Sequence, residues 1–172
     1  MNRIAHHINL LASPTAASAA SGSGAAGASV PIILSGDIGG TRSRLQLWEA
    51  PSPPSGWGDS GRVQSIPGAL LFEQKYLNAS FGSFVEVCRR FLAEATSAGV
   101  LRASGGGDIR CASFAMAGPV NEVKNSLTFT NKSTWGVVDG SALASALSIP
   151  TVKLVNDFVA NGYGLLTLKV SV

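Results

Sequence analysis

Ser35-Gly36-Asp37-Ile38-Gly39-Gly40-Thr41-Arg42-Ser43-Arg44 is the stretch that decides the fold. An apolar run at residues 30–34 precedes it and apolar residues alternate at 45–48 after it. This pattern predicts a strand, a glycine turn and a second strand, with an acid at the end of the first strand. The two glycines allow positive φ and leave the backbone uncovered, so amide N–H groups could approach an anion. Asp37 could hold a hydrated Mg²⁺, and Thr41 could donate its hydroxyl to a phosphate oxygen. A tight hairpin with an incidental aspartate explains the same residues equally well.

Length and composition restrict the class of protein. The chain has 172 residues, 45% of them hydrophobic and 13% charged, which is enough for one ordinary domain with its own core. A net charge of +3 without a basic run argues against a nucleic-acid partner. No segment approaches the roughly 18 consecutive apolar residues of a membrane span. Cys88 and Cys111 lack a CxxC spacing, so we expect small buried residues in a reducing compartment. The sequence predicts a soluble domain.

Residues 1–30 are expected to form a disordered leader outside the fold. From residue 13 to residue 29 every residue is Ala, Ser, Gly, Pro or Thr, and such a segment has too little apolar bulk to offset its ordering entropy. No acidic residue precedes Asp37 and the segment is rich in serine, as in an organelle transit peptide, although Arg3 is its only arginine. A plain low-complexity tail fits equally well. We expect a cytoplasmic protein, or a plastid or mitochondrial one if the leader is a transit peptide.

After the first hairpin, the spacing of apolar residues changes between the strand and the helix period. Strands that alternate with helices predict an α/β domain with a mixed sheet. The clearest helix has Ser83 as its N-cap and Gly99 as its C-terminal stop, with apolar residues on one face and charged residues on the others. The expected elements are a strand at 68–77, a helix at 83–99, a strand at 109–116, a hairpin at 120–129, a helix at 139–147, a strand at 151–155 and a helix at 159–166.

Two acids follow predicted strands, Asp37 after the first and Asp157 after the last. Ligands gather at such strand ends in open α/β sheets. Asn156 and Asp157 have a structural explanation too, because either is a good N-cap for the next helix. The two histidines, His6 and His7, lie in the leader, so a general base in the folded part has to be a carboxylate. The chain has no GxxxxGK[ST], GxSxG or HExxH motif.

Five stretches in order resemble the glucokinase family of bacterial type, among the actin-like sugar kinases. Each is weak alone, but together they span about residues 33–168. Arg42 departs from the family pattern, which usually has asparagine there. The matching stretches are Asp37-Ile38-Gly39-Gly40-Thr41 with Arg44-Leu45, residues 72–76 with 81–84, residues 115–120, the "TN…W" loop at 127–135, and Val155-Asn156-Asp157-Phe158.

This resemblance implies an actin-like (ribonuclease H-like) α/β domain with a mixed sheet flanked by helices. It also implies ATP-dependent phosphorylation of the 6-hydroxyl of glucose, catalysed mainly by positioning and charge stabilisation. Asp157 would be the base that accepts the hydroxyl proton. The remaining roles implied are sugar binding by Asn156 and Asn131, contact with the ATP phosphates by Asp37, Gly39, Gly40 and Thr41, and binding of Mg²⁺ through water by Asp37.

Residues 31–172 correspond to the N-terminal lobe of this family, whose members continue into a second lobe. We therefore expect the chain to be an incomplete copy with little or no kinase activity alone, since phosphoryl transfer needs both lobes to close over the substrates. A full-length protein could form a homodimer. The alternative is a non-catalytic lobe that binds sugar or regulates a partner. A third alternative, a sugar-responsive repressor, would need a helix-turn-helix ahead of the hairpin, which the leader cannot form.

Overall fold

The computed structural model describes residues 31–50, 68–102, 108–129 and 135–165. The expectations for the leader and for Asn131 lie outside these residues. The elements, in chain order, are β1 (Ile32–Ile38), β2 (Arg42–Glu49), β3 (Leu70–Leu77), the 3₁₀ turn η1 (Asn78–Ser80), α2 (Phe84–Ser97), β4 (Ile109–Met116), β5 (Val120–Asn121), β6 (Ser126–Thr128), β7 (Val137–Asp139), α3 (Gly140–Leu147), β8 (Val152–Asn156) and α4 (Asp157–Leu165).

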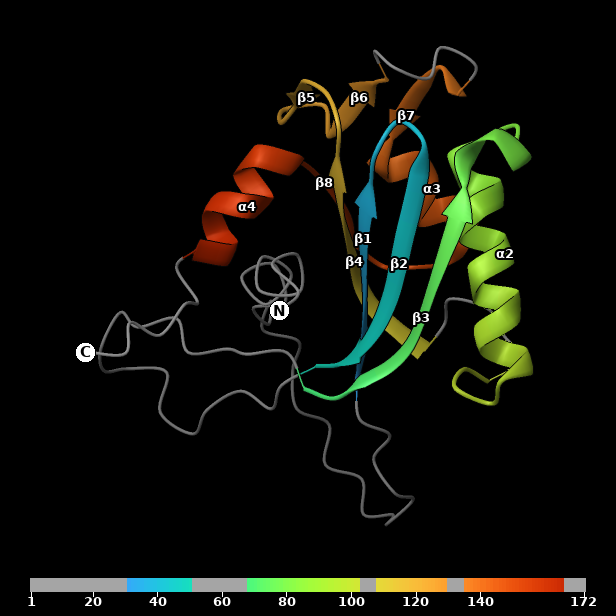
Figure 1. Cartoon of the computed structure of the whole chain (residues 1–172). Coiled ribbons are helices and arrows are strands. Elements are labelled where there is room, and N and C mark those ends of the chain that lie inside the picture. Colours follow the sequence, from blue (N-terminus) through green and yellow to red (C-terminus); the bar gives the residue numbers. More distant parts are fainter. Residues whose placement is uncertain (1–30, 51–67, 103–107, 130–134, 166–172) are drawn as a thin grey trace, which may run out of the picture.

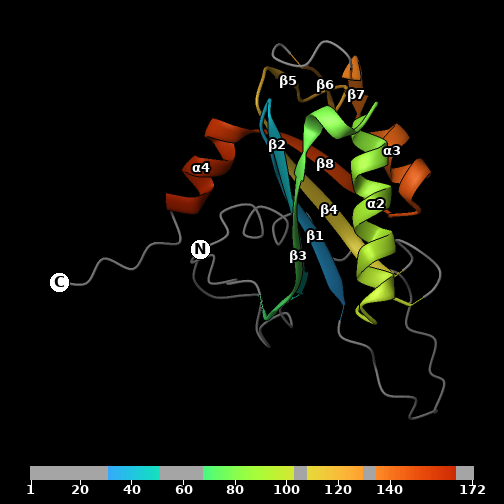
Figure 2. The same cartoon turned by 45° about the vertical axis from the view of Figure 1, so that its right-hand side comes forward.

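A five-stranded sheet in the order β3-β2-β1-β4-β8 forms the centre of the described fold. β1 pairs antiparallel with β2, and β2 with β3, whereas β1 pairs parallel with β4, and β4 with β8. The mixed sheet expected from the sequence is therefore confirmed. Helices α2 and α3 cover one face of this sheet and α4 lies on the other (Figures 1 and 2). A smaller antiparallel sheet, β5-β6-β7, stands at one end.

The main core lies between the large sheet and α2. Leu34 and Leu45 from the sheet are fully buried there, together with Phe84 and Phe91 from the helix. The apolar face of α2 was readable from its spacing, and its six buried residues are Phe84, Val87, Cys88, Phe91, Leu92 and Ala95. The two cysteines are buried, as expected, and free; burial raises the pKa of the Cys88 thiol, so it behaves as a small apolar residue.

The ends of α2 also agree with the sequence. The Oγ atom of Ser83 accepts a hydrogen bond from the N–H of Glu86 at 3.3 Å, which satisfies one of the free donors of the first turn. At the other end, Gly99 adopts a φ of 75°, the left-handed conformation that commonly terminates helices. Among the described residues, no helix is both long and apolar enough to cross a membrane.

Asn125 joins the small sheet to the large one. Asn125 lies in the turn between β5 and β6 and takes a φ of 49°. Its Nδ2 donates to the carbonyl of Val152 at 2.8 Å, and its Oδ1 accepts from the N–H of Leu154 at 2.9 Å. These are the hydrogen bonds that a further strand would make to the edge of β8. A Cβ at Gly140 would overlap the Asn125 amide, so glycine is required at this close approach.

Two boundaries and one strand differ from the sequence expectation. β1 continues through Asp37 to Ile38, because both β2 and β4 pair with it along its whole length. α4 begins at Asp157 and not near residue 159, since the side chain of Asn156 caps it. β7 was not expected, and it forms by pairing with β6. The predicted helix at 139–147 is confirmed: Leu147 is its last residue, and the left-handed Ser148, with a φ of 54°, ends it before proline is reached.

Gly36 provides a test of the packing between sheet and helix. A Cβ at this position would lie 2.6 Å from Cδ1 of Phe114 and 2.7 Å from Cδ2 of Leu45, and both side chains are fully buried. We expect Gly36→Ala to lower the free energy of unfolding by about 1–3 kcal/mol through overpacking. Gly162→Ala in α4 is the matched control, because a Cβ there meets nothing within 4 Å and alanine favours the helix. Urea denaturation measures both changes; a Gly36→Ala protein as stable as the parent would contradict this packing.

Candidate active site

Three parallel strands end at the same edge of the large sheet. Ile38 of β1 lies beside Met116 of β4, and Met116 lies beside Asn156 of β8. The N–H of Ala117 donates to the carbonyl of Ile38 at 3.0 Å, and Nδ2 of Asn156 donates to the carbonyl of Gly118 at 2.9 Å. The turn after β1 and the start of α4 thus flank the turn after β4 (Figure 1). Ligands bind at this type of edge in α/β sheets.

The turn between β1 and β2 contains the two adjacent glycines. The N–H of Gly39 donates to the carbonyl of Arg42 at 3.0 Å and closes the turn. Gly39 and Gly40 are half-buried, and Thr41 and Arg42 are exposed. A Cβ at Gly39 would meet only the Arg42 carbonyl, at 3.5 Å. Among the described residues, no other atom lies within 4 Å of the place that a Cβ of Gly39 would take, so the backbone is uncovered on this side of the turn.

Asn156 and Asp157 open helix α4. Oδ1 of Asn156 accepts from the N–H of Phe158 at 2.9 Å and from that of Val159 at 3.4 Å, so this amide is the helix cap. Oδ1 of Asp157 accepts from the N–H of Phe158 at 3.0 Å. The helix-capping role predicted for one of these two residues is thus confirmed, and Asn156 is the residue that caps the helix. Asp157 occupies the first turn of the helix, where the positive end of the helix dipole favours a carboxylate.

The charge of Asp157 acts on Asp37 across this edge. Asp37 is an exposed residue of β1. The pKa of its carboxyl is raised, first by partial desolvation and then by the negative charge of Asp157, while the Arg44 guanidinium acts in the opposite direction. Like charges at short range disfavour simultaneous ionisation. Two acids that lie 120 residues apart in the chain (157 − 37) are thus near enough at this sheet edge for the charge of one to act on the other.

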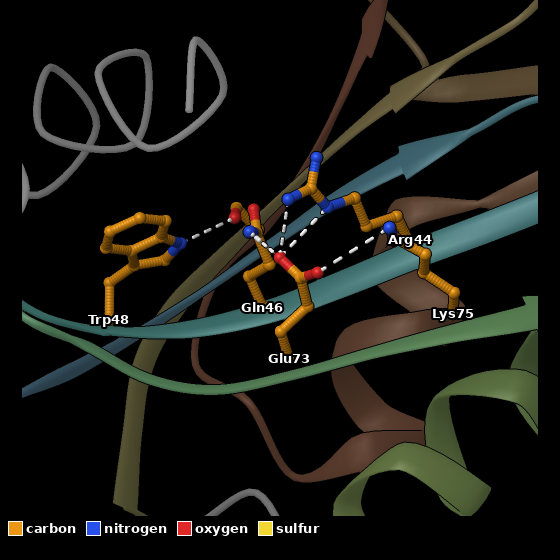
Figure 3. Close-up of polar contacts among 6 residues, drawn as sticks. Arg44, Gln46, Trp48, Glu73 and Lys75 are labelled. Carbon is orange, nitrogen blue, oxygen red and sulfur yellow. Dashed lines mark hydrogen bonds and ion pairs between the residues drawn. The ribbon is translucent and has the colours of Figure 1, made fainter. Parts of the chain in front are cut away.

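A fixed cation lies beside Asp37. Arg44 is the cross-strand partner of Asp37 on β2. Its Nε and Nη2 atoms donate to Oε2 of Glu73 on β3, at 3.0 and 2.6 Å (Figure 3). Nε2 of Gln46 donates to the same oxygen, and Nζ of Lys75 lies 4.0 Å from Oε1. The Arg44 hydrogen bonds hold the pKa of Glu73 below its usual range.

The described residues contain no cluster of three or more His, Cys, Asp or Glu side chains that could hold a metal ion. This finding is compatible with Mg²⁺, which commonly binds one or two carboxylates and takes its other ligands from water and substrate phosphates. Arg44 compensates the negative charge of Asp37 and Asp157 only in part. A divalent cation would reduce the repulsion that remains between the two carboxylates. The residues present fit a hydrated magnesium ion next to Asp37.

Most of the candidate site residues are thus brought together. The glycine turn with Asp37 lies at the same sheet edge as Asn156 and Asp157. Asn131 lies outside the described residues, and its role stays a prediction. Sequence reasoning missed Glu73 and Asn78. Glu73 was visible only as part of a strand, and the contacts of Asn78 reach residues 35 to 39 positions away, so no local pattern signals either residue.

Comparison with known proteins identifies similar chains. The family model described as Glucokinase matches residues 34–171. The glucokinase of Nostoc punctiforme is 33% identical over 138 residues, which is 80% of this chain and 33% of the relative. The glucokinase of Synechocystis sp. is 38% identical over 142 residues, covering 79% of this chain and 34% of the relative. The chain therefore spans about a third of the length of these curated relatives.

Solved structures show the same fold. A glucokinase from an Antarctic psychrotroph is 25% identical, with a TM-score of 0.55 over 81% of this chain and 36% of that one. The glucokinase of Leishmania braziliensis has a TM-score of 0.51 at 18% identity, over 78% of this chain and 32% of that one. The α/β fold with a mixed sheet, expected from the resemblance, is confirmed by these neighbours and by the strand order.

The raised pKa of Asp37 predicts how stability depends on pH. A carboxyl whose pKa is higher in the folded than in the unfolded state binds a proton more readily when folded. Its protonation therefore stabilises the fold at low pH, and this stabilisation is lost as the pH rises through the folded pKa. In EDTA at about pH 7 we expect Asp37→Asn to raise the melting temperature, and at about pH 3 to leave it unchanged.

Asp157→Asn serves as the second arm of this thermal-unfolding experiment. Because the charge of Asp157 contributes to the cost of ionising Asp37, Asp37→Asn should raise the melting temperature less in the Asp157→Asn background than in the parent. A lower melting temperature of Asp37→Asn at neutral pH would show that the Asp37 carboxylate stabilises the fold, contrary to this electrostatic account.

Proposed function

Because the chain belongs to the glucokinase family, we propose that it supplies a phosphate-binding turn and the catalytic base for ATP-dependent phosphorylation of the 6-hydroxyl of glucose. The observation that carries this proposal is the alignment of Ile38, Met116 and Asn156 at one sheet edge, which brings the glycine turn and the start of α4 to either side of the turn after β4. One acid lies just before a backbone turn suited to phosphate, and the other opens a helix. Phosphoryl transfer needs these two functions within reach of each other.

The turn after β1 takes the phosphate side of the reaction. The backbone of Gly39 and Gly40 approaches the phosphate oxygens of ATP, and the exposed Thr41 hydroxyl donates to one of them. Asp37 would hold Mg²⁺ through water. When bound, the ion neutralises the charge that develops on the phosphates. Arg44, fixed by Glu73, keeps a positive charge on the Asp37 side of the site.

Asp157 takes the sugar side. Its carboxylate accepts the proton of the 6-hydroxyl as the hydroxyl oxygen attacks the γ-phosphorus, and the bond to ADP breaks. Asp157 lies in the first turn of α4, at the positive end of the helix dipole. Asn156 keeps this helix start in place through its cap, and the second hydrogen of its amide, beyond the one given to Gly118, donates to a sugar hydroxyl. Asn131 completes the sugar contacts.

The chain contributes only a part of this activity, since it matches about a third of the length of its relatives. We propose that a second lobe is needed to enclose the substrates and exclude water. We propose glucose and ATP as the partners, without nucleic acid or membrane, and a cytoplasmic location; a plastid or mitochondrial location applies if residues 1–30 are a transit peptide. A non-catalytic lobe is the alternative that the following experiment can reveal.

A chimera tests the proposal directly. Residues 31–172 replace the matching third of the Nostoc punctiforme glucokinase, and glucose 6-phosphate production is followed with ATP and Mg²⁺. We expect an active chimera whose kcat falls roughly 10²–10⁴-fold in Asp157→Asn, the usual loss on removal of a general base. The 172-residue chain alone should show little or no activity.

Asp139→Asn is the matched control for this assay. Asp139 also lies at a helix start, where its Oδ1 accepts from the N–H of Ala142 at 2.8 Å, but in α3, which covers the opposite face of the large sheet from α4. We expect this variant to keep kcat within a few-fold of the parent chimera. A folded Asp157→Asn chimera as active as Asp139→Asn would exclude Asp157 as the base. A folded but inactive parent chimera would favour the non-catalytic lobe.

A further inference from the structure

The buried side chain of Asn78 lies beneath the glycine turn. Asn78 is the first residue of η1, directly after β3, and it is 0% exposed. Its Nδ2 donates to the carbonyls of Gly39 and Gly40, at 2.8 and 3.3 Å. Its backbone N–H donates to the carbonyl of Thr41 at 2.9 Å. One residue therefore binds three successive carbonyl oxygens of the turn.

The orientation of the Asn78 amide is fixed from its other end. The hydroxyl of Ser43 donates to Oδ1 of Asn78 at 2.7 Å, and Ser43 is also 0% exposed. With the oxygen engaged in this way, the NH₂ group has to face the glycine carbonyls. An aspartate would bring carboxylate oxygens against those carbonyls, and an alanine would leave buried polar groups without partners. Asparagine has the donor and the acceptor that this position requires.

These contacts determine where the N–H groups of the turn point. In a trans peptide the C=O and N–H bonds are antiparallel. Because the Gly39 and Gly40 carbonyls face Asn78, the N–H groups of Gly40 and Thr41 point away from it. Within the described part of the chain, neither of these two N–H groups donates to a protein acceptor. Two successive amides on the open side of a turn form an anion-binding arrangement.

We infer that Asn78 is a positioning residue: it holds the turn so that the N–H groups of Gly40 and Thr41 face a phosphate group. The inference rests on the phosphate role proposed above for this turn. Asn78 does not touch the ligand itself. Its contribution is preorganisation, because a turn with two adjacent glycines loses much conformational entropy when it is ordered. Without the amide, that entropy would be lost at the moment of binding.

The test compares Asn78→Ala with the parent chain by NMR. The backbone order parameters of Gly39, Gly40 and Thr41 are measured first. We expect them to fall from about 0.85, the value of a rigid backbone, to below about 0.6 in the variant. Inorganic tripolyphosphate is then titrated at a temperature where both proteins are folded. The amide shifts of the turn should report binding by the parent that is roughly tenfold tighter than binding by the variant.

Two further variants make the result decisive. Asn121→Ala removes an exposed asparagine whose side chain caps the β5–β6 turn through the N–H of Lys124 at 3.0 Å, and it should change neither readout. Ser43→Ala releases only the oxygen end of the Asn78 amide and should reproduce the effect in weaker form, which keeps the test open if Asn78→Ala does not fold.

The outcomes separate this inference from the proposed function. The inference alone is overturned if the parent binds tripolyphosphate and a folded Asn78→Ala or Ser43→Ala protein binds it with the same affinity and has an equally ordered turn. No tripolyphosphate shift at the turn of the parent would overturn the phosphate role itself. A loss of affinity in Asn121→Ala as large as that in Asn78→Ala would show that general destabilisation, and not positioning, is responsible.

Discussion

Parallel pairing of β1 with β4, and of β4 with β8, is the constraint on which the site depends. It aligns Ile38, Met116 and Asn156 across the sheet, so that the segments after three strands far apart in sequence meet at one edge. The cost appears at Asp37, whose pKa is raised by partial desolvation and by the charge of Asp157. The second carboxylate makes ionisation of Asp37 more costly. Such an arrangement is typical of functional sites, where charge is concentrated for chemistry.

Asparagine side chains attach the irregular segments to this sheet. Asn125 completes the edge of β8 with two strand-like hydrogen bonds, Asn156 links α4 to the turn after β4, and Asn78 holds the glycine turn. An amide carries both a donor and an acceptor, so each of these side chains satisfies backbone groups that the sheet leaves unpaired. The rigid sheet therefore positions turns that have little regular structure of their own.

The sequence predicted those features that local patterns determine. The first hairpin, the α2 helix with its Ser83 cap and the strand ends that carry Asp37 and Asp157 all follow from spacing over a few residues. The extension of β1 past Ser35 and Gly36 could not be predicted, because it depends on pairing with β2 and β4. Asn78 and Glu73 were missed for the same reason: their partners come from other strands. The role of Asn131 stays a prediction.

The central claim is that the glycine turn and the start of α4 form one site for metal–nucleotide and sugar chemistry. Titration of the chain with ATP and Mn²⁺, which prefers the same oxygen ligands as Mg²⁺, would test it most directly through paramagnetic broadening of backbone amide signals. The account predicts broadening at both Gly39–Thr41 and Asp157–Phe158, while the signals of α2 and of the β5–β6 turn remain sharp. Broadening confined to one of the two segments, or centred elsewhere on the fold, would contradict it.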